Sequence, residues 1–411
     1  MTEPSGLTLT QALAILIPLT ILYLTYRILD LSPGLLTPSS LRAIIFGAPS
    51  PSPSSSIPAY FSLPRALASY NAYRTLALSD IRAMEKSYSR LTYKHKRVGY
   101  VLGYTRKLEE ARRAEEVNAV VCRGVAGLCT DTSEFPATES GADGVFWRWG
   151  WRDEDLQPDV GRVREALKHF VRDWSMEGKE ERRRIFEPIL DVLREDPQAK
   201  EGLKVLVPGS GLGRLAWEIS ELGHDTTAIE LSYFMTLAFR FLLSSKTTQA
   251  TDQHTVHPYA YWFSHSRSSE NTSRGIPFPD VVPRPKDNLR LIEGDFLKHS
   301  PDGAKYDYVV TLFFIDTSLN IISTLEHIHS LLKPGGTWIN LGPLLWTGGA
   351  RARLELSLEE VLRLSEMVGF RIAEEGARKR RTVECEYTGD RMAMMKWMYQ
   401  AEFWVATKAD E

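Results

Sequence analysis

The sequence is poor in cysteine, and this excludes two kinds of site. Only three cysteines occur among 411 residues, Cys122, Cys129 and Cys385, and their spacings follow no regular pattern. An odd number of cysteines at such spacings predicts neither a disulfide framework nor a zinc knuckle. The histidines between positions 254 and 329 also lack the carboxylate or cysteine partners that a metal site needs. We therefore expect a reducing compartment and no metal cofactor.

An excess of charge of one sign is also lacking. The formal net charge is −2 at pH 7, with 25% charged and 43% hydrophobic residues. These values are typical of a folded globular protein. No overall basic field attracts nucleic acid. In the first part of residues 60–200, basic residues are interspersed with acidic ones, and we expect them to form a solvated helix surface. We therefore expect no nucleic-acid partner.

Long apolar runs are absent except near the N-terminus. Residues 7–26 read LTLTQALAILIPLTILYLTY, carry no charge and have about the length that a helix needs to cross a bilayer. We expect residues 1–30 to form a membrane anchor, with a signal peptide or a buried helix as the alternatives. Because Glu3 precedes this segment while Arg27 and Arg42 follow it, the positive-inside rule keeps the rest of the chain cytosolic. Without a span, the expected location is cytoplasmic and nuclear.

Changes in composition divide the remaining chain. Residues 31–59 are rich in proline and serine, which is typical of a linker. Residues 60–200 show apolar side chains at spacings of three and four, which predicts a helical region. Residues 201–411 are predicted to form an α/β domain. Within it, the insertion at 247–287 is rich in Ser, Pro, His and Arg, and we expect a partly ordered flap near the substrate.

A glycine-rich turn follows the first predicted strand of this domain. In the sequence LKVLVPGSGLGRLAWEIS, an apolar run at residues 203–207 precedes the turn and an amphipathic stretch at residues 214–222 follows it. The order of strand, glycine turn and helix is typical of nucleotide-binding domains. Three glycines lack the side chains that would block a ligand beside the helix N-terminus: Gly209, Gly211 and Gly213.

An acidic residue ends the second predicted strand. Residues 226–229 are followed by Glu230, whose carboxylate can accept hydrogen bonds from both hydroxyls of a ribose. Position 214 is arginine, so the pattern is GxGxG rather than the GxGxxG of dinucleotide-binding dehydrogenases, and no GK[ST] of a P-loop follows. We interpret this as the methyltransferase variant, which binds S-adenosylmethionine. A tight turn in an unrelated α/β protein is the alternative.

Later segments complete a seven-stranded sheet. The remaining strands are expected at residues 288–293, at 306–314, after a helix and a KPGG turn, and around 370–373 and 402–406. The expected fold is therefore a Rossmann-like, class I methyltransferase domain preceded by a helical region. Asp295 and Phe296 follow the third strand, where an acid and an aromatic ring could contact adenine.

Four segments between residues 169 and 404 resemble the N2227-like family, whose characterised activity is carnosine N-methyltransferase. They read FVRDWSMEGKEER, VLVPGSGLGRLAWEI, FFIDTSLNIISTLEHIHSLLKPGGTWINLGPLL and MMKWMYQAEFWV. The resemblance leaves the hydrophobic N-terminus outside. Together with the turn, it gives these candidate cofactor-binding residues: His169, Arg172, Gly209, Gly211, Gly213, Glu230, Asp295, Phe296 and Thr311. The family has Gln at the position of His169 and Cys at that of Thr311.

The resemblance also implies that Asp316 binds the imidazole of the substrate. A carboxylate that accepts the distal N–H would fix the tautomer and stabilise the charge that develops on methylation, so Asp316 is the candidate catalytic residue. The alternative is an N-cap, because DTSLN is also a reasonable capping sequence. Thr347 stands where the family has a substrate-binding His. Tyr387 and Tyr399 are further candidate substrate contacts, with core packing as the alternative.

The expected function is transfer of a methyl group from S-adenosylmethionine to an imidazole nitrogen of a histidine-containing dipeptide or related small molecule. Two alternatives stay open. In the first, the acceptor is a protein histidine or another metabolite. In the second, which Thr347 suggests, the chain is a membrane-tethered binding module with reduced catalysis. The sequence leaves the oligomeric state open, with a homodimer among the alternatives.

Overall fold

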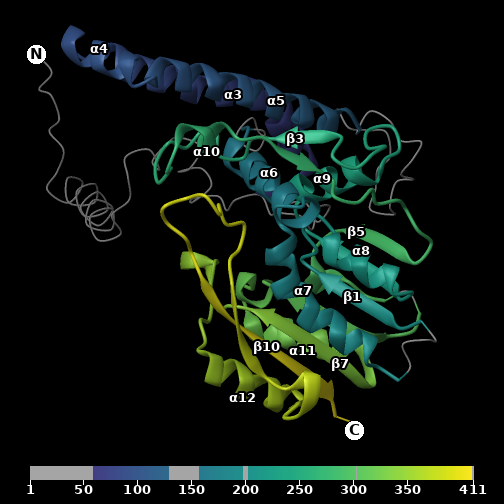
Figure 1. Ribbon diagram of the computed structural model, residues 1–411. Coiled ribbons are helices and arrows are strands. Elements are labelled where there is room, and N and C mark those ends of the chain that lie inside the picture. Colours follow the sequence, from purple (N-terminus) through teal and green to yellow (C-terminus); the bar gives the residue numbers. More distant parts are fainter. Residues whose placement is uncertain (1–58, 129–156, 198–201, 302, 410–411) are drawn as a thin grey trace, which may run out of the picture. The chain divides into compact units, whose positions relative to one another are not determined.

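A computed structural model describes residues 59–128, 157–197, 202–301 and 303–409 (Figure 1). The predicted anchor at residues 7–26 and nearly all of the linker lie outside these described residues. Within them, none of the helices combines the length and the apolar character that crossing a membrane requires.

One mixed sheet of eight strands forms the centre of residues 202–409, in the order β5-β2-β1-β6-β7-β10-β8 with β9 paired to β10. Neighbouring strands from β5 to β7 are parallel, and β10 runs antiparallel to β7, β8 and β9. The strands are β1 (Lys204–Pro208), β2 (Asp225–Glu230), β5 (Leu289–Glu293), β6 (Tyr306–Leu312), β7 (Leu332–Gly342), β8 (Phe370–Ile372), β9 (Arg381–Cys385) and β10 (Tyr399–Lys408). This arrangement is a Rossmann-like class I methyltransferase fold, so the predicted α/β part of the fold class is confirmed.

The eighth strand, β9, corrects the expected number of seven. Its sequence RTVEC has a single fully buried side chain, Cys385, while Arg381, Thr382 and Glu384 are exposed. Such a strand carries little apolar signal, and it forms because its backbone pairs with β10 over five residues. The pairing lies between segments about 20 residues apart, which local sequence does not reveal.

Side chains on both faces of the sheet are buried, and successive residues of a strand pack on opposite faces. Val205 and Val207 pack with α7 (Lys179–Arg194) and α8 (Arg214–Glu221), whereas Leu206 packs on the side that contains α11. Because both faces are covered, these strands are continuous apolar runs. The second layer consists of α11 (Ile321–Leu331) and α12 (Leu358–Val368), and α9 (Tyr233–Leu243) follows β2 in the chain.

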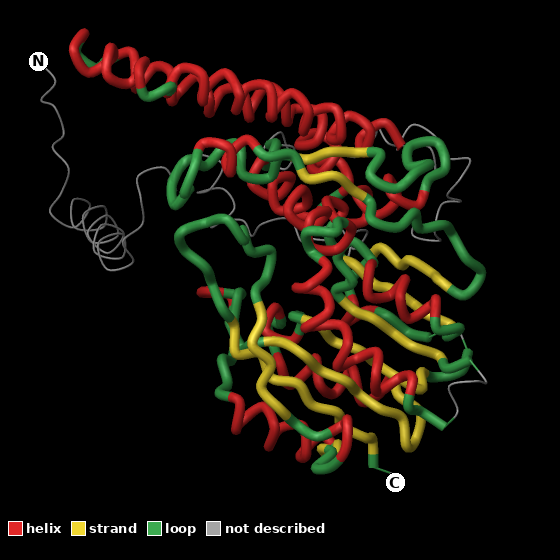
Figure 2. Tube along the Cα trace, in the orientation of Figure 1, coloured by secondary structure: helices red, strands yellow, loops and turns green. Residues whose placement is uncertain are grey.

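A helical region precedes the sheet, as the periodicity predicted (Figure 2). It contains α3 (Leu63–Ser89), α4 (Tyr93–Val101), α5 (Tyr104–Gly127) and α6 (Val160–Trp174), after the short 3₁₀ helix η2 (Ala59–Phe61). Side chains of α3, α5 and α6 share one hydrophobic cluster with α9. The helical region is therefore packed onto the α/β domain through α9.

The insertion at residues 247–287 differs from the flap that its composition predicted. All of its residues are described, and it contains a two-stranded ribbon, β3 (His254–Val256) and β4 (Ile276–Phe278), with the short helix α10 (Ser269–Ser273) between them. Val256, Ile276 and Phe278 are buried in the same cluster as the helical region. A few apolar anchors thus order an otherwise polar segment.

Two glycines with left-handed backbones allow a matched test of this packing. A Cβ on Gly213 (φ 71°) would lie 2.3 Å from Phe239 Cε1, whereas a Cβ on Gly223 (φ 94°) would meet no atom within 4 Å. Gly223→Ala should lower the free energy of unfolding by about 1–2 kcal/mol through backbone strain alone. Gly213→Ala should cost about 1–3 kcal/mol more, because overpacking is added to the strain. Urea unfolding checks both values, and equal losses would contradict this account of Gly213.

Candidate active site

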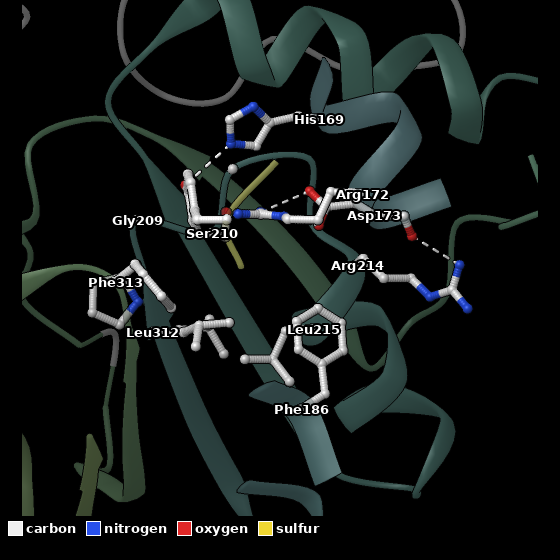
Figure 3. A pocket seen from close by; sticks show the side chains of 14 residues that line it. His169, Arg172, Asp173, Phe186, Gly209, Ser210, Arg214, Leu215, Leu312 and Phe313 are labelled. Carbon is white, nitrogen blue, oxygen red and sulfur yellow. Dashed lines mark hydrogen bonds and ion pairs between the residues drawn. The ribbon is translucent and has the colours of Figure 1, made fainter. Parts of the chain in front are cut away.

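A cleft lies at the carboxyl ends of β1 and β6, between the sheet and α6 (Figure 3). In α/β sheets of this kind, ligands bind outside the carboxyl ends of the strands. Five residues predicted from the sequence line the cleft: His169, Arg172, Gly209, Gly211 and Tyr387. The structure also adds lining residues that the sequence did not single out as site residues, among them Asp173, Ser210, Arg214 and Phe313.

The glycine turn is shaped by left-handed backbones. Gly209 has φ 62°, and a Cβ there would lie 2.5 Å from the ring of Phe314, so packing requires glycine. Gly211 has φ 56°, and a Cβ there would meet only the Arg172 guanidinium, at 4.0 Å. Gly211 is therefore the position where the backbone lies open to a ligand. Gly213 instead faces Phe239, so it serves the packing of the turn.

Glu230 lies at the end of β2, directly beside this turn. Its Oε2 accepts the N–H of Gly211 at 2.8 Å, and its Oε1 accepts the N–H of Ser232 at 2.8 Å. The residue is only 9% exposed, and burial raises the pKa of its carboxyl group. A carboxylate has about four lone-pair sites, so two hydrogen bonds leave acceptor capacity for ribose hydroxyls.

A buried cation lies next to the glycine turn. The Arg172 guanidinium donates to both carboxylate oxygens of Asp173, at 2.6 and 2.9 Å, and lies 4.5 Å from the ring centroid of Tyr387. Burial lowers the pKa of Arg172, but the charge and hydrogen bonds of Asp173 together with the charges of Tyr387 and Glu181 outweigh it, and the pKa is raised. Arg172 therefore remains a cation. A fixed guanidinium suits the carboxylate of a bound amino acid.

His169 is held as a neutral imidazole. Its Nδ1 lies 2.9 Å from the carbonyl oxygen of Glu165, which can only accept, so Nδ1 carries the proton. Its Nε2 then accepts a hydrogen bond from the Tyr387 hydroxyl at 3.1 Å. Burial and the charge of Arg172 lower the pKa of His169, which favours this neutral form. His169 thus positions Tyr387 at the cleft.

Phe313 is a lining residue that the sequence did not reveal. It has φ 50°, a left-handed conformation that is uncommon for a bulky residue and is often found at functional sites. Its ring centroid lies 4.6 Å from that of Tyr387 and 5.6 Å from that of Tyr399. The segment FFID contains two adjacent rings, and its letters do not indicate which of them faces the cleft.

Asp316 follows Phe313 by three residues, in the short 3₁₀ helix η7 (Ile315–Thr317). Its Oδ2 accepts the N–H of Leu345 at 3.0 Å, and its carbonyl oxygen accepts the N–H of Thr347 at 3.1 Å. Burial raises the pKa of Asp316 to about 6. The capping alternative was wrong, because α11 begins at Ile321 and its N-cap residue is Asn320.

Three further candidates have other contacts. Asp295 is the N-cap of the 3₁₀ helix η6 (Phe296–Lys298), and Phe296 packs on Phe314 with 5.4 Å between ring centroids. Gly294 donates its N–H to the carbonyl oxygen of Glu230 at 3.0 Å, so this segment lies beside the acid that is expected to bind the ribose. The hydroxyl of Thr311 is fully buried and bonds the side chains of Trp338 and Asn340, each at 2.8 Å. The adenine contacts of Asp295 and Phe296 stay predictions, as does the cofactor contact of Thr311.

A cluster of buried charges joins the insertion to the cleft. Asp280 accepts hydrogen bonds from Arg182 and from Arg214, the latter at 2.6 Å. Arg214 also donates to the carbonyl oxygen of Asp173 at 3.0 Å. The sequence marked Arg214 only as the residue that interrupts the glycine pattern. In the structure it connects α8, α6 and the insertion.

Comparison with known proteins identifies the family. The family model described as carnosine N-methyltransferase matches residues 151–410. The chain belongs to this family. A carnosine N-methyltransferase of Rattus norvegicus is 36% identical over 260 residues, which cover 61% of this chain and 64% of the rat protein. One of Schizosaccharomyces pombe is 31% identical over 373 residues, covering 84% of this chain and 94% of that protein.

The match therefore spans slightly less than two thirds of the rat protein. Among solved structures, a Haloferax volcanii methyltransferase complex with Trm112 has a TM-score of 0.37 at 14% identity, covering 59% of this chain and 97% of that chain. Magnesium protoporphyrin IX methyltransferase of Synechocystis with bound SAH has a TM-score of 0.35 at 14% identity, covering 61% and 95%. Because both scores are low, the fold assignment depends on the strand order.

The cofactor is S-adenosylmethionine, and the residues around the turn fit its parts. The Glu230 carboxylate fits the ribose hydroxyls, and the Arg172 guanidinium fits the carboxylate of the methionine moiety. The open backbone at Gly211 lies between these two groups, since it bonds Glu230 and lies near Arg172.

Two acids at equivalent positions of neighbouring strands allow a test of cofactor binding. Glu230 and Glu293 are register partners in β2 and β5, and Glu293 pairs with Arg240 at 3.0 Å. Glu230→Gln should weaken cofactor binding about 30-fold or more, because charge-assisted hydrogen bonds contribute about 1.5–3 kcal/mol. Glu293→Gln should leave the affinity close to that of the unchanged chain. Titration calorimetry with S-adenosylmethionine measures both, and equal affinities would refute the role of Glu230.

Proposed function

We propose that this chain transfers a methyl group from S-adenosylmethionine to an imidazole nitrogen of a histidine-containing dipeptide such as carnosine. Membership of the carnosine N-methyltransferase family supports the reaction class. The observation that carries the proposal is the buried carboxylate of Asp316, three residues after Phe313 of the cleft. A buried acid close in sequence to a ring of the cleft suits a planar acceptor that becomes positively charged.

Asp316 orients the acceptor ring in this proposal. The Leu345 N–H holds Oδ2 of the carboxylate, which restricts its rotation. The carboxylate accepts the distal N–H of the imidazole, so that the other nitrogen presents its lone pair. Bound S-adenosylmethionine supplies an electrophilic methyl group on its sulfonium sulfur. Since the methyl is already reactive, in-line positioning matters more than a strong base.

The aromatic rings of the cleft fix the plane of the acceptor imidazole and stabilise the positive charge of the methylated product. Phe313 contacts both Tyr387 and Tyr399 through its ring. Aromatic faces attract cations, so these rings stabilise the imidazolium that forms when the nitrogen bonds to the methyl carbon and the carbon–sulfur bond of the donor breaks. The distal proton of that cation then passes to Asp316, whose pKa of about 6 lets it accept the proton near neutral pH.

Thr347 sets the breadth of the acceptor site. Its side chain is exposed, and its backbone N–H bonds the carbonyl oxygen of Asp316. A threonine lacks the imidazole with which the family's histidine contacts the substrate. Asp316 and the aromatic rings of the cleft therefore recognise the imidazole of the acceptor. A shorter side chain at an exposed position also admits a larger acceptor, which favours a protein histidine as the second candidate.

We also propose the layout and location that the sequence predicts. Residues 1–30 are a membrane anchor, 31–59 a linker, 60–200 a helical region and 201–411 the methyltransferase domain on the cytosolic side. The uncharged segment at residues 7–26 and the arginines after it support this proposal. A homodimer remains compatible with it.

A labelled-methyl assay tests the function. The chain should transfer the tritiated methyl of S-adenosylmethionine to carnosine, and mass spectrometry of the product should place the methyl on the imidazole. Asp316→Asn should lower kcat about 100-fold, because a preorganised charge in a buried site is lost. Cofactor binding should persist in this variant. Transfer to proteins of a cell extract but to no dipeptide would replace the first candidate by the second, and no transfer at all would refute the proposal.

The pH dependence gives a second test. The carboxylate of Asp316 is ionised above its raised pKa of about 6, and the free imidazole is neutral above about 6.5. Both groups must be deprotonated in the productive encounter, so log kcat/KM should rise with a slope that approaches about 2 at low pH. In Asp316→Asn only the substrate titrates, and the slope should approach about 1. The same slope in both proteins would contradict the role of Asp316.

A further inference from the structure

The connection between α3 and α5 lies at the outer end of the helical region and is exposed. We call residues 86–107 the hairpin tip; they comprise the end of α3, all of α4 and the start of α5. Figure 1 shows α4 at the outer end of the long α3–α5 hairpin. The tip lies outside residues 151–410, which match the family model.

The tip is strongly basic, unlike the interspersed charge expected for this region. Residues 86–108 contain seven Lys or Arg residues and neither Asp nor Glu. The basic residues are Lys86, Arg90, Lys94, Lys96, Arg97, Arg106 and Lys107. A cluster of this density attracts anions over a distance of about one Debye length.

The tip also exposes apolar side chains. Val101 and Leu102 are each 78% exposed, Tyr93 is 80% exposed and Tyr100 is 70% exposed. Leu91 and Val98 are exposed as well, and α4 has no buried residue at all. Contiguous exposed apolar side chains usually mark an interaction site. Packing against the described part of the chain does not account for them.

The backbone of the tip is fixed without these side chains. The Tyr88 hydroxyl donates to the carbonyl oxygen of Lys96 at 2.5 Å. The Tyr88 ring packs closely on Gly99, where a Cβ would lie only 2.6 Å from the ring. The ring centroids of Tyr88 and Tyr104 are 5.0 Å apart. The Thr92 hydroxyl accepts the N–H of His95 as an N-cap. The exposed side chains are thus presented on a preorganised support.

We propose that the hairpin tip docks on the surface of a membrane that contains anionic phospholipid. Lys and Arg side chains attract the headgroups, while Tyr, Val and Leu side chains enter the interface. Exposed aliphatic side chains favour a lipid surface over RNA, whose backbone and bases offer polar and stacking contacts. A second copy of the tip is disfavoured, because it would bring two basic clusters together.

The predicted anchor gives an independent reason for a membrane partner. Residues 7–26 are expected to insert with the remainder of the chain on the cytosolic side, where anionic lipid is abundant. A basic patch is a common second signal beside a hydrophobic one. The tip proposal does not depend on the proposed methyl transfer.

A local probe on the full chain tests the docking. Tyr100→Cys is labelled with an environment-sensitive fluorophore in a Cys129→Ser background, because Cys122 and Cys385 are fully buried. The emission should shift to the blue on vesicles of phosphatidylcholine and phosphatidylserine, and not on phosphatidylcholine alone. A probe at Met367→Cys, on α12, should show no shift. This readout reports on the tip even where the N-terminus binds vesicles by itself.

Charge neutralisation provides the matched comparison. Arg90→Gln, Lys94→Gln and Arg97→Gln together should weaken the vesicle titration about 100-fold, since each cation near an anionic surface contributes about fivefold. The control removes three exposed cations elsewhere, by Arg363→Gln, Arg371→Gln and Lys379→Gln, and should leave the titration unchanged. Val101→Ser with Leu102→Ser should remove the blue shift without changing thermal unfolding.

Three outcomes would overturn the proposal. The first is an equal shift on neutral and anionic vesicles, and the second is an equal titration by the tip variant and the control variant. The third is a tip-dependent affinity for single-stranded RNA with no shift on either kind of vesicle. Loss of the shift in the tip variant alone supports docking on anionic lipid.

Discussion

The hydrogen bond from Gly211 N–H to the Glu230 carboxylate is the contact on which the cofactor site depends. It joins the glycine turn after β1 to the end of β2, two strands that are already in parallel register. The left-handed backbone of Gly211 is what directs its N–H towards the acid. Burial raises the pKa of Glu230, and hydrogen bonds from the backbone N–H groups of Ser232 and Gly211 partly offset this cost. A charged acceptor is thereby held ready beside an open backbone.

The second constraint comes from outside the sheet. Asp280 of the insertion bonds Arg182 of α7 and Arg214 of α8, so three segments distant in sequence meet at one carboxylate. Removing one partner of such a buried cluster leaves an unpaired charge, which is costly. The cleft therefore has a fixed wall on the side of α6. The hairpin tip, by contrast, projects away from this wall and is free to serve another surface.

Local patterns were sufficient for the centre of the fold and for part of the site. The strand, turn and helix around Gly209, the acid at Glu230 and the acid at Asp316 are all encoded within short segments, and the structure has them at the ends of strands. Phe313 could not be predicted, because its left-handed backbone follows from tertiary packing. Asp280 could not either, since its partners lie about 70 and 100 residues away.

In the proposed function, the threonine at position 347 leaves recognition of the acceptor to Asp316, which is buried, and to the half-buried rings of the cleft. A histidine there would offer a second polar contact to an imidazole, whereas Thr347 contributes a backbone N–H that is used by Asp316. In the proposed function, the acceptor is then fixed by the carboxylate of Asp316 and by the rings of Phe313 and Tyr387. In the proposed reaction the ring becomes a cation only on methylation, and the pKa of Asp316, about 6, then lets its carboxylate take up the distal proton near neutral pH.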